Sequence, residues 1–108
     1  MDPKYIIVFV TAPTTDDGRK IAQTLVREKL AACVNILPGI TSIYTWDGET
    51  CEDDEVLLII KTRADLFETL SAAVQVVHPY DVPEVIATPL TDGAPDYLHW
   101  IDQVTQGK

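Results

Sequence analysis

Residues 32–63 read ACVNILPGITSIYTWDGETCEDDEVLLIIKTR, and this stretch decides the fold. Asp47-Gly48 near its centre is a two-residue turn of the type that needs positive φ, so a hairpin is predicted. The outgoing arm should bend or bulge at Pro38-Gly39, and the return arm ends in the unbroken apolar run 56–60. Arms of about fifteen residues span about 50 Å at about 3.3 Å per residue. We therefore expect the hairpin tip to project beyond the body of the protein.

The segments around this hairpin alternate between strand and helix patterns. Residues 5–10 form an apolar, β-branched run that predicts a strand buried on both faces. Residues 14–29 and 66–77 carry apolar stripes at helical spacing, and His78-Pro79 ends the second helix. Residues 84–90 predict a fourth strand, and Pro95 begins a last helix. The side chains expected to face inward from that helix are Tyr97, Trp100, Ile101 and Val104.

The predicted order is strand, helix, strand, strand, helix, strand and an extra C-terminal helix. This order indicates an α+β, ferredoxin-like βαββαβ subunit within a single domain, residues 1–108. Its antiparallel sheet would have the spatial order 4-1-3-2, with the second and fourth strands at the edges. Pro38 and Pro89 fall in these two strands, where a missing backbone donor is tolerated.

The composition of the chain argues against two classes of binding partner. The 108 residues include 17 acidic and 8 basic side chains, and a formal charge of -9 disfavours nucleic acids and anionic membranes. The apolar run at residues 5–10 is too short for a membrane span, and no export signal precedes it, so we expect a cytoplasmic protein. A mean hydropathy of +0.07 predicts that part of the surface is covered by another subunit.

The projecting hairpin suggests where that subunit interface lies. Ile43, Tyr44 and Trp46 occupy its outgoing arm, and an exposed apolar edge strand invites aggregation. A closed homo-oligomer covers such edges without leaving one free. We therefore assign these three residues to an interface between copies of the chain.

With the segments placed, the chain resembles the CutA (divalent-cation tolerance) family over nearly its whole length. The matching stretches are 30–36 with Pro38-Gly39, Ser42-x-Tyr44-x-Trp46-x-Gly48, 55–62, His78-Pro79-Tyr80 with Pro83-Glu84, and Tyr97-Leu98-x-Trp100. The resemblance implies a homotrimer similar in architecture to the PII-type signalling proteins, linked to tolerance of copper and other divalent metals. It implies no catalysed reaction and no required cofactor.

Metal binding by this chain would rest on few soft donors. Copper favours several converging thiolate, thioether or imidazole groups, and the sequence offers Cys33, Cys51, His78, His99 and Met1 without a paired motif. In some bacterial relatives the proposed copper ligands are a thiol in the first strand and two adjacent histidines. Here those positions are Val10, Val77 and His78, so His78 is the one candidate ligand for copper or another divalent cation. Alternatively, His78 only interacts with the helix C-terminus.

A second candidate site is a pocket between subunits formed by Lys61, His78, Tyr80 and Glu84, suited to a small anionic ligand. Alternatively, Lys61 forms an internal ion pair with a residue such as Glu84. The acidic residues near the hairpin tip are expected to form a solvated face; they are Asp47, Glu49, Glu52, Asp53, Asp54 and Glu55.

An enzyme is the least favoured class. Acylphosphatase shares the predicted fold, but its anion-binding loop requires Arg and Asn, and the segment Thr11-Ala12-Pro13-Thr14 has neither. Cys51 lies among carboxylates that disfavour a thiolate. The sequence therefore predicts a non-catalytic trimer in metal tolerance, or else a PII-like trimeric sensor of a small molecule without direct metal binding.

Overall fold

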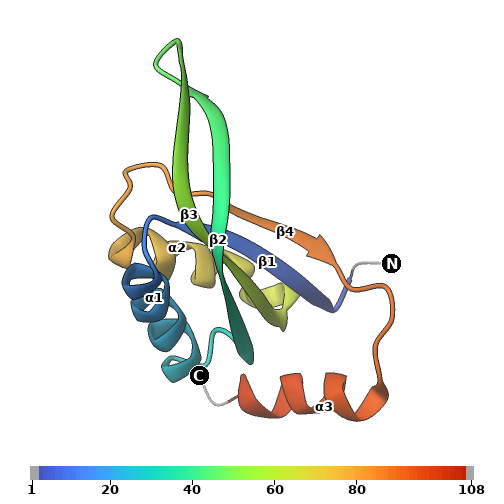
Figure 1. The fold of residues 1–108 in the computed structure, drawn as a ribbon. Coiled ribbons are helices and arrows are strands. Elements are labelled where there is room, and N and C mark those ends of the chain that lie inside the picture. The colour runs from blue at the N-terminus through green and yellow to red at the C-terminus, as the bar shows by residue number, and fades with distance from the viewer. Residues whose placement is uncertain (1–2, 107–108) are drawn as a thin grey trace.

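The computed structural model describes residues 3–106. Along the chain its elements are β1 (Tyr5–Ala12), α1 (Thr15–Arg27), β2 (Cys33–Trp46), β3 (Glu49–Arg63), the short 3-10 turn η1 (Ala64–Leu66), α2 (Phe67–Val77), β4 (Val85–Pro89) and α3 (Pro95–Val104). Helices α1 and α2 lie together beside the sheet, and α3 lies at the end away from the hairpin tip (Figure 1).

The four strands form one antiparallel sheet in the order β2-β3-β1-β4. This is the order predicted from the sequence, and Pro38 and Pro89 do lie in the two edge strands. An edge strand tolerates proline because it has only one neighbour to which its backbone must donate.

The core lies between one face of the sheet and helices α1 and α2. Burial alternates strictly along β1, where Ile6, Val8, Val10 and Ala12 are buried and the residues between them are partly exposed. The prediction that this run is buried on both faces is therefore wrong for the single chain, because helices cover only one face of β1. On α1 the Thr14 hydroxyl accepts a hydrogen bond from the Asp17 amide and caps the helix.

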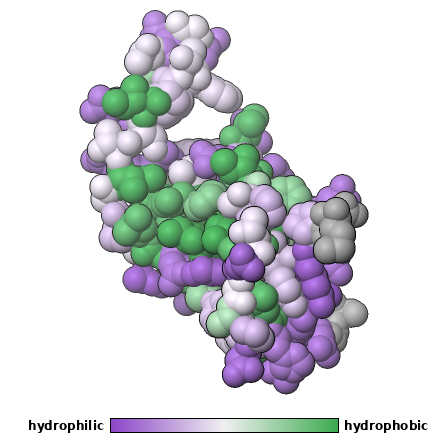
Figure 2. Space-filling view, turned by 90° about the vertical axis from the view of Figure 1, so that its right-hand side faces the viewer, coloured by the Kyte–Doolittle hydropathy of each residue, from purple (hydrophilic) through white to green (hydrophobic). Residues whose placement is uncertain are grey.

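The second face of the sheet carries apolar side chains that no helix or strand within residues 3–106 fully covers. Cross-strand neighbours on this face include Phe9 with Ile59 and Ile86, and Leu57 with Leu37. Ile86 keeps 55% of its surface exposed, and Leu37 is also exposed. Hydrophobic side chains gather in a continuous area over one face of the molecule (Figure 2). We call the patch formed by Leu37, Leu57, Ile59, Phe9 and Ile86 the open face.

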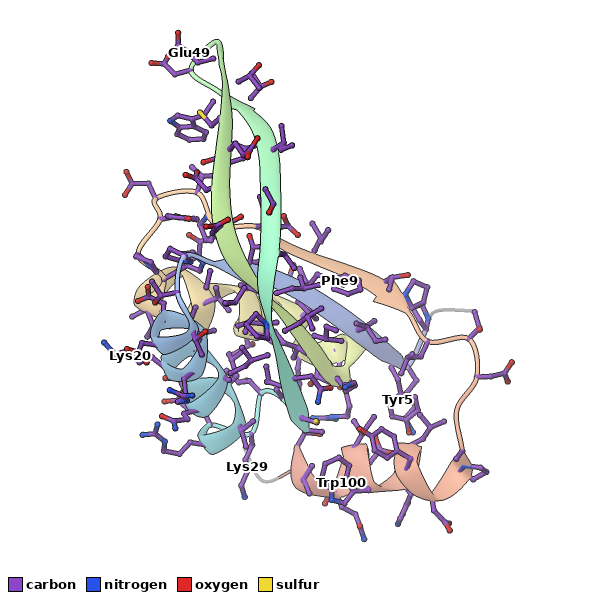
Figure 3. The ribbon with its side chains drawn as sticks, in the orientation of Figure 1. Tyr5, Phe9, Lys20, Lys29, Glu49 and Trp100 are labelled. Carbon is purple, nitrogen blue, oxygen red and sulfur yellow. The ribbon has the colours of Figure 1, made fainter. Side chains whose placement is uncertain are left out.

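Helix α3 is held at one end of the sheet by polar contacts. The Tyr5 hydroxyl donates to the Asp102 carboxylate at 2.7 Å, and the Arg63 Nε donates to the Thr105 hydroxyl at 3.0 Å. Figure 3 shows Tyr5 extending toward α3. Ile101 is buried as predicted, but Tyr97 and Trp100 are 42% and 38% exposed, so the predicted inward stripe is wrong for these two rings. Helix α3 therefore leaves both rings partly in solvent.

The β2–β3 hairpin projects well beyond the body, as predicted, and Glu49 lies at its tip (Figures 1 and 3). Asp47 and Gly48 form its turn with φ values of 51° and 77°. The register shifts between Leu37 and Ile40, so the predicted irregularity at Pro38-Gly39 is a bulge. Beyond this bulge, β2 and β3 pair only with each other.

Candidate binding site at the base of the hairpin

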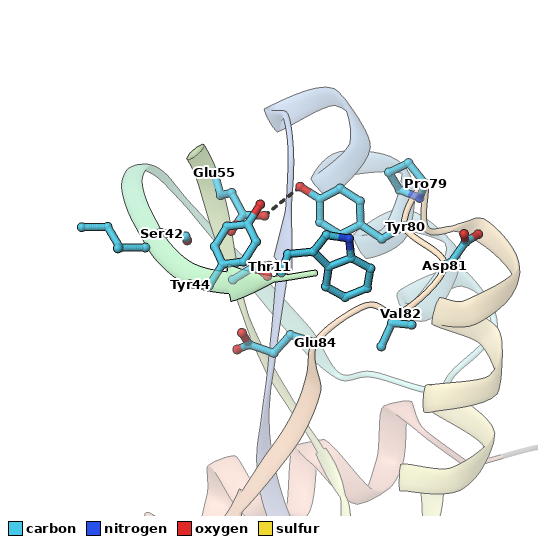
Figure 4. A pocket seen from close by; sticks show the side chains of 11 residues that line it. Thr11, Ser42, Tyr44, Glu55, Pro79, Tyr80, Asp81, Val82 and Glu84 are labelled. Carbon is cyan, nitrogen blue, oxygen red and sulfur yellow. Dashed lines mark hydrogen bonds between the residues drawn. The ribbon is translucent and has the colours of Figure 1, made fainter. Parts of the chain in front are cut away.

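A cavity of about 710 Å³ lies where the hairpin leaves the body, opposite the segment 79–84 (Figure 4). Its walls come from the end of β1, the last third of β2, one residue of β3 and the segment after α2. The lining residues are Thr11, Ser42, Ile43, Tyr44, Trp46, Glu55, Pro79, Tyr80, Asp81, Val82 and Glu84. Its volume falls within the range of small-molecule sites, about 300–1,000 Å³.

Strand lengths explain why the cavity forms at this level. The ladder between β1 and β3 ends with Ala12 opposite Val56, so Glu55 is the first residue of β3 without a β1 partner. The segment 79–84 passes this point between α2 and β4 and brings Tyr80 to the hairpin base. The cavity is therefore bounded by the end of β1, by the part of the β2–β3 hairpin that extends past β1, and by the segment 79–84.

Glu55 and Tyr80 form the central polar contact of the cavity. The Tyr80 hydroxyl donates to the Glu55 Oε2 at 3.0 Å (Figure 4), and Glu55 is only 7% exposed. Burial and the hydrogen bond to Glu55 raise the pKa of Tyr80 to about 12, so the hydroxyl keeps its proton at neutral pH. The interpretation of Glu55 as part of a solvated acidic face is therefore wrong. It differs from its acidic neighbours because it lies at the body edge rather than on the projecting arm.

The residues predicted to form the subunit interface supply the hairpin wall of the cavity. Ile43, Tyr44 and Trp46 all line the cavity and are exposed in the single chain. The Tyr44 hydroxyl donates to the Asp53 carboxylate on the facing strand, and this bond raises the pKa of Tyr44 to about 12. These side chains form an aromatic wall on the projecting arm of β2.

His78 lies behind the cavity and orients Tyr80. Its Nε2–H donates to the Thr11 carbonyl at 2.7 Å, and its Nδ1 accepts from the Tyr80 backbone amide at 3.0 Å. A carbonyl only accepts and an amide N–H only donates, so these partners require the neutral Nε2–H tautomer. His78 also ends α2 as predicted, with its own amide donating to the Val74 carbonyl. In this arrangement both ring nitrogens are engaged, and the imidazole connects the end of β1 to the cavity loop.

Lys61 lies away from the other three residues of the predicted pocket. It pairs with Ile7 and Cys33 on the neighbouring strands, six residues along β3 from Glu55, which is about 20 Å of extended chain. Its Nζ donates to the Asn35 side-chain oxygen, so the predicted ion pair with Glu84 is absent from residues 3–106. Within one chain, Tyr80 and Glu84 line the cavity, His78 supports it and Lys61 does not reach it.

The remaining soft donors do not converge. Residues 3–106 contain no group of three or more His, Cys, Asp or Glu side chains placed to hold a metal ion. Cys33 and Cys51 are both free thiols, and His99 is exposed on α3.

Sequence reasoning missed Glu55 and Asp81 as lining residues. Glu55 directly precedes the apolar run 56–60, and this position at the border between body and arm was the available signal. Asp81 follows the His-Pro-Tyr stretch within a segment that has no periodicity to show which side chains face a cavity.

The fold and the site define the class: a small α+β protein with one antiparallel sheet, helices packed on one face, and a projecting hairpin with a cavity at its base. The family model of the CutA1 divalent ion tolerance protein matches residues 6–104. The chain belongs to this family.

Individual relatives agree along most of the chain. It is 48% identical over 99 residues to the divalent-cation tolerance protein CutA of Thermus thermophilus, covering 92% of this chain and 96% of that protein. It is 54% identical over 101 residues to the chloroplastic protein CutA of Arabidopsis thaliana, covering 94% of this chain but 56% of that longer protein. The crystal structure of CutA1 from Oryza sativa superposes with a TM-score of 0.94 at 47% identity, covering 98% of this chain and 97% of that one. These relatives are named as tolerance proteins or simply as CutA, and none of these names is that of an enzyme.

No helix within residues 3–106 has the length and apolar character needed to cross a lipid bilayer.

Proposed function

We propose that the chain is a non-catalytic homotrimer that acts in tolerance of, or response to, divalent metal ions, with copper as the principal metal. Family membership supports the role in divalent-cation tolerance. The observation that carries the assembly is the open face together with the projecting hairpin, because both expose apolar side chains that a small isolated protein normally covers. We also assign the protein to the cytoplasm, where its two free thiols would stay reduced.

The assembly is tested by light scattering of the purified protein at micromolar concentration, with and without copper. We expect a mass three times the 12.0 kDa of one chain in both conditions. A stable species of 12.0 kDa would refute the trimer and the interface assigned to Ile43, Tyr44 and Trp46. A mass that rises only with copper would instead make the metal part of the interface.

Copper binding by His78 is tested separately. To coordinate a metal, His78 has to release either the Thr11 carbonyl or the Tyr80 amide, since both ring nitrogens are engaged. Further ligands would have to come from other copies, because residues 3–106 of one chain hold no converging donor set. We expect equilibrium dialysis to show copper binding that His78→Ala abolishes and that His99→Ala, at an exposed histidine, leaves intact. Equal binding by both variants would remove His78 from the site.

The cavity favours a second candidate function, a PII-like trimeric sensor of a small molecule for which cation tolerance is indirect. Its volume and its mixture of aromatic and carboxylate side chains suit an organic ligand better than a metal ion. Absence of metal affinity together with a thermal shift caused by a small molecule would favour this function over the first.

A further inference from the structure

Within residues 3–106, Glu55 is a buried carboxylate without a positively charged partner. It is 7% exposed, and its one hydrogen-bond partner among residues 3–106 is the neutral Tyr80 hydroxyl. The salt bridges of the described chain involve other residues, namely Lys4 with Asp102, Arg19 with Asp16 and Arg63 with Asp65. Buried charges in proteins are normally paired, because removing a carboxylate from water is costly. The second carboxylate oxygen of Glu55 is not fully buried, so it keeps access to solvent, and Glu55 lines the cavity.

The other walls of the cavity also favour positive charge. Asp81 and Glu84 add two more carboxylates, and the lining contains no Lys, Arg or His. The rings of Tyr44, Trp46 and Tyr80 supply aromatic faces, which attract cations through their quadrupoles. A small anion would meet three carboxylates here, so the sequence-based expectation of an anionic ligand does not fit the cavity of one chain.

The cations within residues 3–106 either have other side-chain partners or lie on or near α1. Those with a side-chain partner are Lys4, Arg19, Arg63 and Lys61. The others within residues 3–106 are Lys20, Arg27 and Lys29, on or directly after α1, which packs on the opposite side of the sheet from the open face. No Lys or Arg occurs between Arg63 and Lys108. A ligand from solution is therefore the better source of the missing positive charge.

We propose that this cavity binds a small organic cation, whose ammonium or guanidinium group pairs with Glu55 while its hydrocarbon part lies against the ring of Tyr44. An organic cation fits better than a bare metal ion, because the lining offers apolar and aromatic surface and no converging set of three metal-ligating side chains. This inference rests on the second candidate function, the small-molecule sensor, and specifies the charge and chemistry of its ligand.

The test is isothermal titration calorimetry of the full chain with four probes of equal chain length: n-butylammonium, n-butylguanidinium, n-butanol and butyrate. We expect the two cations to bind at least about tenfold more tightly than the alcohol, and butyrate not to bind. Equal affinity for butanol would show a merely apolar cavity and overturn the proposal. Absence of binding by either cation at ligand concentrations up to about 10 mM would also overturn the proposal. It would indicate that a neighbouring copy of the chain fills the cavity.

A matched pair of variants tests the role of Glu55. Glu55→Gln removes the charge but keeps an oxygen that accepts the Tyr80 hydrogen bond, whereas Asp54→Asn removes the same charge from the adjacent exposed residue, which does not line the cavity. We expect Glu55→Gln to weaken cation binding by about tenfold or more and Asp54→Asn to change it less than about twofold. Equal losses of cation affinity in the two variants would show that only the general surface charge attracts the cation, and would contradict the proposal.

Two controls separate this inference from the proposed function. Circular dichroism and light scattering establish that both variants keep the fold and the mass of the parent protein. A monomeric parent protein would refute the proposed assembly whatever the calorimetry shows. An intact trimer without cation selectivity would refute only the ligand assignment.

Discussion

Tyr80→Phe removes the hydroxyl that pairs with the buried carboxylate of Glu55 and leaves the ring in place. A hydrogen bond to a charged group contributes about 1.5–3 kcal/mol, and water entering the open cavity replaces part of it. We therefore expect the free energy of unfolding to fall by about 1–2 kcal/mol at pH 7, which for a chain of this size lowers Tm by about 4–8 °C. Protein concentration is held fixed, because assembly itself shifts Tm.

Alkaline pH gives an independent signature of the same contact. Burial and the bond to Glu55 raise the pKa of Tyr80 from 10.0 to about 12 in the folded chain. The unfolded chain therefore loses the phenolic proton first, so the contribution of Tyr80 to stability is complete below pH 10 and is lost between pH 10 and 12. Because Tyr80 is 37% exposed, solvent screening reduces this contribution to about 1 kcal/mol.

Chemical denaturation of the parent protein and Tyr80→Phe at several pH values measures both effects. The stability difference between them should shrink from pH 10 to pH 12, and in a Glu55→Gln background the cost of Tyr80→Phe at pH 7 should fall. A Tyr80→Phe variant within about 0.5 kcal/mol of the parent at pH 7, with an unchanged alkaline profile, would refute the view that the Tyr80 hydroxyl supports a buried charge.

Three further substitutions test the core, the turn and the open face. Thr62→Val removes the buried hydroxyl that donates to the Leu30 carbonyl at 2.7 Å. Urea denaturation should show that the free energy of unfolding falls by about 1–2 kcal/mol. The control Thr69→Val, on the exposed side of α2, should lower it by about 0.5 kcal/mol or less. Gly48→Ala places a side chain at φ 77° in the hairpin turn and should lower the free energy of unfolding by about 1–2 kcal/mol, measured by thermal unfolding. Gly48→Asn should lower it clearly less, because Asn tolerates positive φ. Equal losses in the two variants would contradict a turn governed by positive φ. Ile86→Glu puts a charge on the open face at its β4 edge and should lower the mass measured by light scattering toward that of one chain, while an unchanged mass would exclude this part of the face from the interface.

The fold was predictable because its signals are local in the sequence. The turn at Asp47-Gly48 requires positive φ at both residues, and the structure has it. Pro38 and Pro89 marked the edge strands, since every backbone N–H of a central strand faces a neighbouring strand, whereas half of those on an edge strand face solvent. The exposed rings of Tyr97 and Trp100 were not predictable in the same way, because helical spacing identifies an apolar stripe but not how much of it the sheet covers.

The candidate site was predicted only in part, because its members depend on where strands end. Tyr80 and Glu84 were identified and do line the cavity. Lys61 was included because it follows the same apolar run that Glu55 precedes, and without the β1–β3 register nothing in the sequence shows which end of that run faces the loop at residues 79–84. The register places Glu55 beside that loop and Lys61 about 20 Å away.

The unequal lengths of β1 and β3 connect the hairpin to the cavity. Strand β3 has 15 residues and β1 has 8, so residues 49–55 of β3 extend past the end of β1. Residues 56–63 of the strand are shielded by the body, and residues 49–54 are mostly exposed to solvent. Glu55 lies at the boundary, where a carboxylate is buried enough to require a partner yet remains accessible to a ligand from solution. Shortening the hairpin at its tip should therefore leave the Glu55–Tyr80 contact intact, whereas extending β1 past Ala12 would close the cavity that the projecting arm creates.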